Sequence, residues 1–257
     1  MQSLKDRIVC ITGASAGIGE ACAEAFARHG AHLFLSARRK DRIDVLAGRL
    51  RTEHGIRTLT ARLDVTSPAD VDAVFSGLPP EWRDVDILVN NAGLSRGLGG
   101  LQEGSLQDWE EMIDTNIKGL LYVTRRVLPG MVRRNAGHVI NIGSIAGHQV
   151  YPGGNVYCAS KAAVNMLTHG IRMDVLGTDV RVSSVEPGLV ETEFSEVRFR
   201  GDRERAAKVY AGTRPLTGAD VAEIVVYCAQ QPPHVDIAQV VVMPTDQASV
   251  YHVHRRT

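Results

Sequence analysis

Short apolar or β-branched runs alternate along the chain with longer segments in which polar and apolar residues mix at helical spacing. The runs predict strands at 7–12, 32–37, 58–65, 85–93, 138–144, 180–188 and 238–244. The segments between them predict helices that begin near Gly17, Asp41, Pro68, Asp108 and Ala219, and one more that carries Tyr157. Strands that are apolar along nearly their whole length are typical of a parallel sheet buried on both faces.

This alternation of strands and helices predicts an α/β fold. When right-handed crossovers connect the strands, the helices cover both faces, so we expect a Rossmann-type doubly wound parallel sheet. The sequence has no low-complexity linker and no internal repeat. We therefore interpret 1–257 as a single domain.

The segment 189–217 is the exception to this regular pattern. It is rich in charged residues, lacks a clean period and follows the carboxyl end of a predicted strand. Open α/β sheets bind ligands outside those ends, so we interpret the segment as a lid over the substrate. A solvated surface connection is the alternative.

Composition and charge narrow the range of partners. The 257 residues include 29 Lys+Arg and 29 Asp+Glu, so no net charge attracts the chain to nucleic acid or to an anionic membrane. The first residues lack the apolar stretch of a signal peptide, and no run reaches the roughly 18 apolar residues of a membrane span. The four cysteines form no CxxC pair, and no histidine lies in an HExxH pattern. We expect a cytoplasmic protein that binds a small molecule but no metal, nucleic acid or membrane.

A glycine-rich turn, TGASAGIG at 12–19, joins the first strand to the first helix. Glycines let the backbone approach a ligand, and the free N–H groups at a helix N-terminus attract a phosphate. The spacing is G-x-x-x-G-x-G rather than the G-x-G-x-x-G common in dinucleotide sites. A tight packing corner is the alternative, but the position between strand and helix favours a pyrophosphate site. Its expected cofactor-binding residues are Gly13, Ser15, Gly17, Ile18 and Gly19.

The end of the second strand, SARRKDR, indicates which dinucleotide binds. Sites for NAD commonly place an acidic residue here, which holds the ribose hydroxyls. This chain has Ala37 followed by Arg38 and Arg39, whose guanidinium groups match a 2′-phosphate. We therefore expect NADP(H) as the cofactor, although Asp41 lies nearby and a solvated helix start is the alternative. The ends of the third and fourth strands supply residues beside the expected adenine: Asp64, Val65, Asn91, Ala92 and Gly93.

Two polar side chains stand out in the small and apolar stretch GGNVYCASKAAV. Tyr157 and Lys161 are four residues apart, so on a helix they share one face. A tyrosine ordinarily titrates near pH 10, and a neighbouring ammonium stabilises the phenolate. Ser144, at the carboxyl end of the preceding strand, can hold a substrate oxygen while the phenol exchanges its proton. The three residues are therefore candidates for general acid–base chemistry.

In this order, TGASAGIG, NNAG, Ser144, Tyr157-x-x-x-Lys161 and PG at 187–188 resemble the short-chain dehydrogenase/reductase family, over essentially the whole chain. The resemblance implies that Tyr157 is the catalytic acid or base, that Lys161 also binds the nicotinamide ribose, and that Ser144 orients the substrate. It also implies that Asn116, in MIDTNIKG, anchors a proton-relay water. A polar residue that kinks the helix is the alternative for this asparagine. Further cofactor contacts are implied for Pro187, Gly188, Val190 and Thr192.

Other stretches resemble the NADP-dependent 3-hydroxy acid dehydrogenases within that family, among them YPGGNVY, VEPGLVETEFSEVRF and the ending VVVMPTDQASVYHVHRR. The resemblance implies oxidation of serine, L-allo-threonine or related 3-hydroxy acids, or reduction of 3-oxo acids such as malonic semialdehyde. The substrate carboxylate needs a cationic partner, and Arg198 in the lid is our candidate. Arg96 is a second candidate at the rim, and a solvated position is the alternative for both arginines.

Two other functions remain open from the sequence: reduction of bulkier ketones or aldehydes, and a non-catalytic NADP-binding sensor or interaction protein. The helices that carry Asn116 and Tyr157 are apolar around more of their circumference than one sheet-facing stripe needs. Relatives in the resembled family commonly pair these helices in tetramers. We therefore expect a homotetramer, with a dimer as the alternative.

Overall fold

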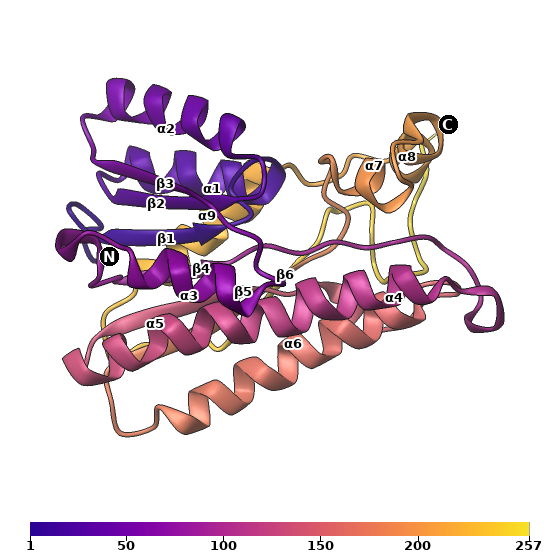
Figure 1. The fold of residues 1–257 in the computed structure, drawn as a ribbon. Helices are drawn as coiled ribbons and strands as arrows, with labels where there is room; N and C mark the ends of the chain where they lie inside the picture. The colour runs from indigo at the N-terminus through magenta and orange to yellow at the C-terminus, as the bar shows by residue number, and fades with distance from the viewer. Residues whose placement is uncertain (257) are drawn as a thin grey trace.

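Seven parallel strands form one sheet in the order β3-β2-β1-β4-β5-β6-β7 (Figure 1). The structure is a computed structural model that describes residues 1–256. The strands are β1 (Ile8–Thr12), β2 (His32–Ala37), β3 (Thr58–Arg62), β4 (Ile87–Asn90), β5 (Gly137–Ile142), β6 (Val180–Pro187) and β7 (Gln239–Val242). The strand order reverses between β1 and β4, which is where open α/β sheets form their ligand crevice. The predicted doubly wound fold is confirmed.

Helices cover both faces of the sheet, as Figure 1 shows. Alternate residues of β1 point to opposite faces: Val9 and Ile11 enter one apolar core, and Ile8 and Cys10 enter the other. The first core contains side chains of α1 (Gly17–Arg28), α2 (Lys40–His54) and α9 (Gly218–Ala229). The second contains side chains of α3 (Pro68–Ser76), α5 (Leu120–Arg134) and α6 (Asn155–Asp174). Strands buried on both sides explain the continuous apolar runs of the sequence.

The long helix predicted from Asp108 is interrupted. It consists of α4 (Leu106–Ile113), a π-helical turn (Asp114–Gly119) and then α5. Within the turn, Gly119 passes close to β3's end: a Cβ added there would lie 2.7 Å from Cγ2 of Val65. Isolated π-helical turns frequently occur at functional sites, and this one contains Asn116.

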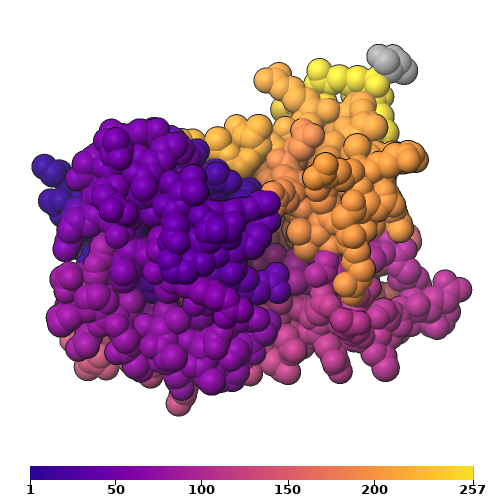
Figure 2. Space-filling view, turned by 45° about the horizontal axis from the view of Figure 1, so that its top comes forward, coloured from indigo at the N-terminus to yellow at the C-terminus, as the bar shows by residue number. Residues whose placement is uncertain are grey.

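The predicted lid, 189–217, contains two short helices, α7 (Phe194–Arg198) and α8 (Arg203–Tyr210). Both lie beyond the carboxyl ends of the strands, next to the C-terminal residues (Figure 1). In the space-filling view the orange lid lies against the magenta segment around residue 100, and the indigo N-terminal part lies on its other side (Figure 2). The charged side chains of α8 are exposed, whereas every residue of α7 is buried or half-buried.

Apolar side chains are exposed on the outer surface of the helices that carry the candidate catalytic residues. They are Ile113, Leu121, Val132, Met166 and Met173. Along residues 1–256, none of the helices has the length and apolar character needed to cross a membrane.

Candidate active site

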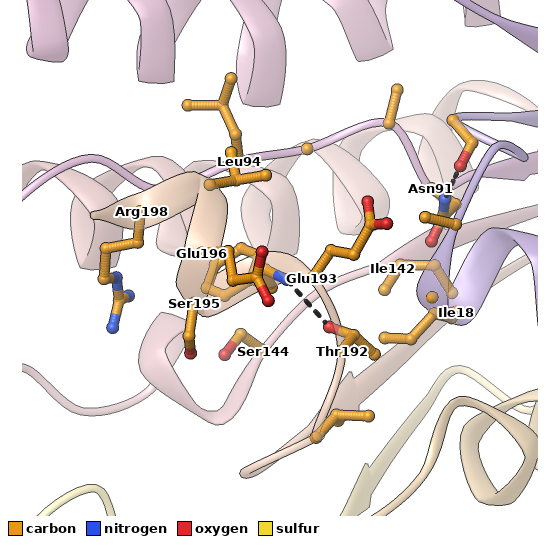
Figure 3. A pocket seen from close by; sticks show the side chains of 18 of the residues that line it. Ile18, Asn91, Leu94, Ile142, Ser144, Thr192, Glu193, Ser195, Glu196 and Arg198 are labelled. Carbon is orange, nitrogen blue, oxygen red and sulfur yellow. Dashed lines mark hydrogen bonds between the residues drawn. The ribbon is translucent and has the colours of Figure 1, made fainter. Parts of the chain in front are cut away.

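A cavity of about 810 Å³ lies outside the carboxyl ends of the strands, between the sheet and the lid. Each of the first six strands contributes lining residues at or just after its end: Gly13, Ala37, Leu63, Asn91, Ile142 and Pro187. In Figure 3, Arg198 lies at one end of the labelled side chains and Ile18 and Asn91 at the other. All the site residues predicted from the sequence line this cavity except Gly19 and Asn116.

The glycine-rich turn presents its backbone to the cavity. Gly13 and Gly17 have φ angles of +66° and +60°, a conformation that side chains disfavour. No side chain caps α1 at Ala16, so the N–H groups of its first turn are free to bind an anion. Asn91 supports the turn from β4, because its Nδ2 donates to the carbonyls of Thr12 (3.0 Å) and Gly13 (3.1 Å).

Gly19 has a packing role in this structure. A Cβ at this position would lie 2.5 Å from the carbonyl oxygen of Gly13 and would also collide with Nδ2 of Asn91. The residue is buried and does not line the cavity. The third glycine of the motif is therefore needed for close approach of α1 to the turn, which is the packing alternative that the sequence left open.

Three arginines surround the expected 2′-phosphate position. Nη1 of Arg39 and Nη1 of Arg42 pair with the two carboxylate oxygens of Glu193, at 2.8 and 2.6 Å. Nε of Arg39 also donates to Oγ of Ser15 (3.2 Å). The guanidinium of Arg38 has no ion pair or hydrogen bond with the described part of the chain. Sequence reasoning missed Arg42, and its position in the first turn of α2, directly after the Arg38-Arg39 pair, was the available signal.

Tyr157 is 8% exposed, and its ring centroid lies 5.6 Å from that of Phe194. Burial raises the pKa of Tyr157 above the usual value, while the charge of Arg198 and the hydroxyl of Ser144 act in the opposite direction. The guanidinium carbon of Arg198 lies 5.3 Å from the ring centroid of Tyr157. In this structure, the cation against the phenol ring is therefore supplied by the lid.

Lys161 lies one turn further along α6, as predicted, and it is buried. Its Nζ donates to the carbonyl of Ile142 (2.8 Å) at the end of β5. Burial lowers the pKa of Lys161 to about 8, and the negative charge of Glu186 opposes that effect. This amine is therefore held among the expected nicotinamide neighbours at the end of β5.

The sequence did not single out Glu186, which directly precedes the Pro187-Gly188 pair. Its side chain is fully buried, accepts hydrogen bonds from Oγ of Ser184 and Nε2 of Gln239 (both 2.8 Å), and pairs with His148. A buried carboxylate at this place favours the ammonium form of Lys161. Its position beside a motif of the family was the available signal.

Asn116 lies behind the cavity wall in the π-helical turn. Its Oδ1 accepts from the N–H of Leu94, and its Nδ2 donates to the carbonyl of Leu94 (both 2.8 Å) and to Oγ of Ser160 (2.9 Å). Oγ of Ser160 in turn donates to the carbonyl of Tyr157 (2.7 Å). The side chain therefore joins the segment after β4 to the helix that carries Tyr157, and both of its amide hydrogens have protein acceptors.

Ser144 follows β5 and lines the cavity, as Figure 3 shows. Its Oγ accepts from the N–H of Ala146 (3.1 Å), which orders the short turn after the strand. The hydroxyl donates only weakly to the carbonyl of Pro187, which is 3.5 Å away, and it also acts on the phenol of Tyr157. The hydroxyl can therefore turn toward a ligand oxygen.

The two arginines that the sequence proposed for the substrate differ in their ion pairing. Arg96 is paired with Glu111 (2.6 Å) and also donates to the carbonyl of Val197 in the lid. Arg198 has no carboxylate partner within residues 1–256. Its Nε donates to Oγ of Ser95 (3.0 Å) and its Nη2 to Oη of Tyr151 (2.7 Å). These neutral partners orient its guanidinium but leave its charge uncompensated.

The chain is similar to known dehydrogenases and reductases over nearly its whole length. The family model of short chain dehydrogenases matches residues 7–202. An NADP-dependent 3-hydroxy acid dehydrogenase of Salmonella typhimurium is 50% identical over 250 residues, which cover 96% of this chain and 99% of that protein. Sulfoacetaldehyde reductase 2 of Chromohalobacter salexigens is 46% identical over 250 residues, which cover 96% and 98%. The solved structure of the closed form of a serine dehydrogenase with NADP+ superposes with a TM-score of 0.90 at 47% identity, covering 97% of this chain and 100% of that one.

Proposed function

The chain belongs to the short-chain dehydrogenase family, and we propose that it is an NADP-dependent oxidoreductase of small 3-hydroxy acids. The reaction interconverts the 3-hydroxyl and 3-oxo groups of substrates of the serine, L-allo-threonine or 3-hydroxypropionate and malonic semialdehyde type. Two similar proteins, at 50% and 47% identity, are a 3-hydroxy acid dehydrogenase and a serine dehydrogenase bound to NADP+. Likeness over nearly the whole chain supports the same chemistry here.

The residues that line the cavity support a site for NADP(H). The carboxylate of Glu193 lies between Arg39 and Arg42, which supports binding of an anionic phosphate by these guanidinium groups. The uncapped start of α1 suits the pyrophosphate, and Asp64 and Val65 line the adenine end. Asn91, Ala92 and Gly93 line the cavity beside that end. The nicotinamide half would be held by Lys161 together with Tyr157, Pro187, Gly188, Val190 and Thr192. Bound NADP+ supplies the hydride acceptor.

The residues of the chain supply the proton chemistry. Ser144 holds the substrate hydroxyl, and Tyr157 as phenolate removes its proton. The charge of Arg198 against the ring favours the phenolate, and we take the ammonium of Lys161, one helical turn away, to act in the same direction. The phenol returns its proton to solvent by way of Lys161 and a water at Asn116. In the reverse direction, Tyr157 protonates the oxygen of the 3-oxo acid. The cavity between sheet and lid restricts water and holds the reacting groups together.

The observation that carries the substrate class is the uncompensated guanidinium of Arg198 beside Tyr157. Three aromatic rings surround it, with centroids 5.3 Å (Tyr157), 5.2 Å (Phe194) and 5.8 Å (Tyr151) from its central carbon. A charge in such surroundings gains most from an anionic ligand. A carboxylate bound there is next to the phenol, so a hydroxyl on a nearby carbon reaches Tyr157.

We expect Arg198→Met to raise the KM for 3-hydroxypropionate about 10- to 100-fold, because a charge-assisted hydrogen bond is lost. The KM for a short neutral alcohol should stay within about twofold. The measurement is the initial rate of NADP+ reduction at 340 nm over a range of substrate concentrations. Sulfoacetaldehyde with NADPH belongs in the panel, since a sulfonate presents similar oxygens to the same guanidinium.

The matched control is Arg200→Met. Arg200 is also a lid arginine that lines the cavity, but its guanidinium is paired with Asp108. An unchanged KM for the acids in the Arg198 variant, together with turnover of bulky neutral ketones by the wild type, would leave the family chemistry intact and remove the 3-hydroxy acid assignment.

For the assembly we propose a homotetramer, with a dimer as the alternative. The exposed apolar side chains of α5 and α6, such as Leu121, Met166 and Met173, support a helix-to-helix interface. Multi-angle light scattering of the purified protein should give about four times the chain mass of 27.9 kDa. A monomeric mass would contradict this proposal.

A further inference from the structure

Glu193 immediately precedes α7, at the start of the lid, and binds across the nucleotide end of the cavity. Its Oε2 lies 2.8 Å from Nη1 of Arg39 and its Oε1 lies 2.6 Å from Nη1 of Arg42. Burial opposes ionisation of this carboxyl, but the hydrogen bonds and charges of both arginines outweigh it and hold the pKa of Glu193 below its usual range. Glu193 is therefore an anion seated on two cations that line the cavity.

We propose that Glu193 is an internal competitor for the 2′-phosphate of NADP and thereby a residue that sets cofactor specificity. This inference rests on the proposed function, because it takes the arginine cluster (Arg38, Arg39 and Arg42) to be the phosphate site. In this structure, the carboxylate pairs with two members of this cluster. The phosphate has to displace the carboxylate in order to bind to them.

The competition favours a phosphate over a carboxylate. A phosphate monoester carries about −1.5 to −2 charges near neutral pH and offers three oxygens, whereas Glu193 carries one charge and two oxygens. The guanidinium of Arg38, which lacks an ion pair with the described residues, is available for the additional contact. The 2′-hydroxyl of NAD has no charge with which to displace Glu193, so the contact of Glu193 with the arginines remains when NAD binds.

Glu193 reaches the arginine cluster because this part of the lid lies against the nucleotide end of the cavity. The adjacent Thr192 lies over the glycine-rich turn: a Cβ at Gly17 would be 3.2 Å from Cβ of Thr192. The lid therefore folds down at both the pyrophosphate and the 2′-phosphate positions in this structure. The end of α7 is held separately, since the N–H of Gly97 donates to the carbonyl of Arg198 (3.1 Å).

The strength of the ion pairs between Glu193 and the arginines determines how much the affinity for a 2′-phosphate should change when the Glu193 charge is removed. The side chains of Glu193 and Arg39 are 40% and 41% exposed, so solvent weakens their pairing. A carboxylate that blocks the cluster part of the time reduces the apparent affinity by the fraction of time that the cluster is free. Removal of the Glu193 charge should therefore increase the affinity for a 2′-phosphate by about 3- to 10-fold.

The test is isothermal titration calorimetry of the full chain with adenosine 2′,5′-bisphosphate and with 5′-AMP. Neither ligand contains nicotinamide, so the measurement is independent of turnover. We expect Glu193→Gln to bind the bisphosphate about 3- to 10-fold more tightly than the wild type and 5′-AMP with unchanged affinity. Glu196→Gln is the matched control, because this lid carboxylate also lines the cavity but is paired with Arg203.

Each other outcome overturns a defined part of the argument. Unchanged or weaker binding of the bisphosphate by Glu193→Gln means that Glu193 supports the arginines rather than competing for them. An equal gain for 5′-AMP, or an equal gain in Glu196→Gln, means that the effect is general electrostatics. If the wild type binds the bisphosphate no more tightly than 5′-AMP, the 2′-phosphate site itself fails, and this inference fails with it.

Discussion

Tyr157→Phe is expected to lower kcat by about 10³-fold while the dissociation constant for NADPH stays within about twofold. The substitution removes the hydroxyl that exchanges the proton. It keeps the ring that packs against Phe194 and under the guanidinium of Arg198. The Tyr157→Phe variant should therefore fold and bind the cofactor normally, and only the proton transfer should be lost.

The measurement pairs steady-state oxidation of 3-hydroxypropionate with fluorescence titration of NADPH. Tyr151→Phe is the matched control: Tyr151 also lines the cavity and contacts Arg198, but it lies outside α6 and is not expected to transfer a proton. The kcat of Tyr151→Phe should fall far less than the loss of about 10³-fold expected for Tyr157→Phe. A Tyr157→Phe enzyme that keeps more than about a tenth of wild-type kcat would contradict the assignment of this residue as the acid–base group.

Arg38→Ala is expected to lower kcat/KM for NADP+ about 10- to 100-fold and to leave kcat/KM for NAD+ within about twofold. The reason is that Arg38 is the member of the arginine cluster without a carboxylate partner among the described residues, so its charge is available to the 2′-phosphate. The loss of a charge-assisted hydrogen bond to an ionised group accounts for the size of the effect.

Initial rates with both cofactors at a saturating concentration of one hydroxy acid measure this preference. Lys40→Ala is the matched control, because this neighbouring cation is paired with Asp44 (2.7 Å) and does not line the cavity. If kcat/KM fell equally for NADP+ and NAD+ in the Arg38 variant, Arg38 would have a structural role and would not recognise the phosphate.

The residues that sequence reasoning placed well are those whose signal is local. Tyr157 and Lys161 share a helix face because they are four residues apart, and both line the cavity. The glycines at 13 and 17 have the positive φ that a turn between strand and helix requires. Seven strands formed where apolar runs predicted them, with ends that shifted by a few residues: β3 ends at Arg62 rather than at 65.

Other features depend on which segments meet in space. The sequence treated the helix around Asn116 as continuous. The structure has a π-helical turn there, in which the asparagine contacts Leu94 and Ser160, 22 and 44 residues away. Gly19 belongs to the glycine motif by spacing, and only the structure shows that the nearness of the Gly13 carbonyl leaves no room for a side chain there.

The arginines of the cavity show most clearly which features the sequence predicts and which depend on the tertiary structure. From the sequence alone, Arg38 and Arg39 were both candidates for the 2′-phosphate, and Arg198 was preferred to Arg96 for the substrate carboxylate. In the folded chain, Glu111 pairs with Arg96 and Glu193 pairs with Arg39. Arg38 and Arg198 have no ion-pair partner among the described residues. Local spacing determines secondary structure because backbone geometry and burial act between near neighbours. The sheet and lid bring together charges up to 154 residues apart, so only the tertiary structure decided which cations remain available to a ligand.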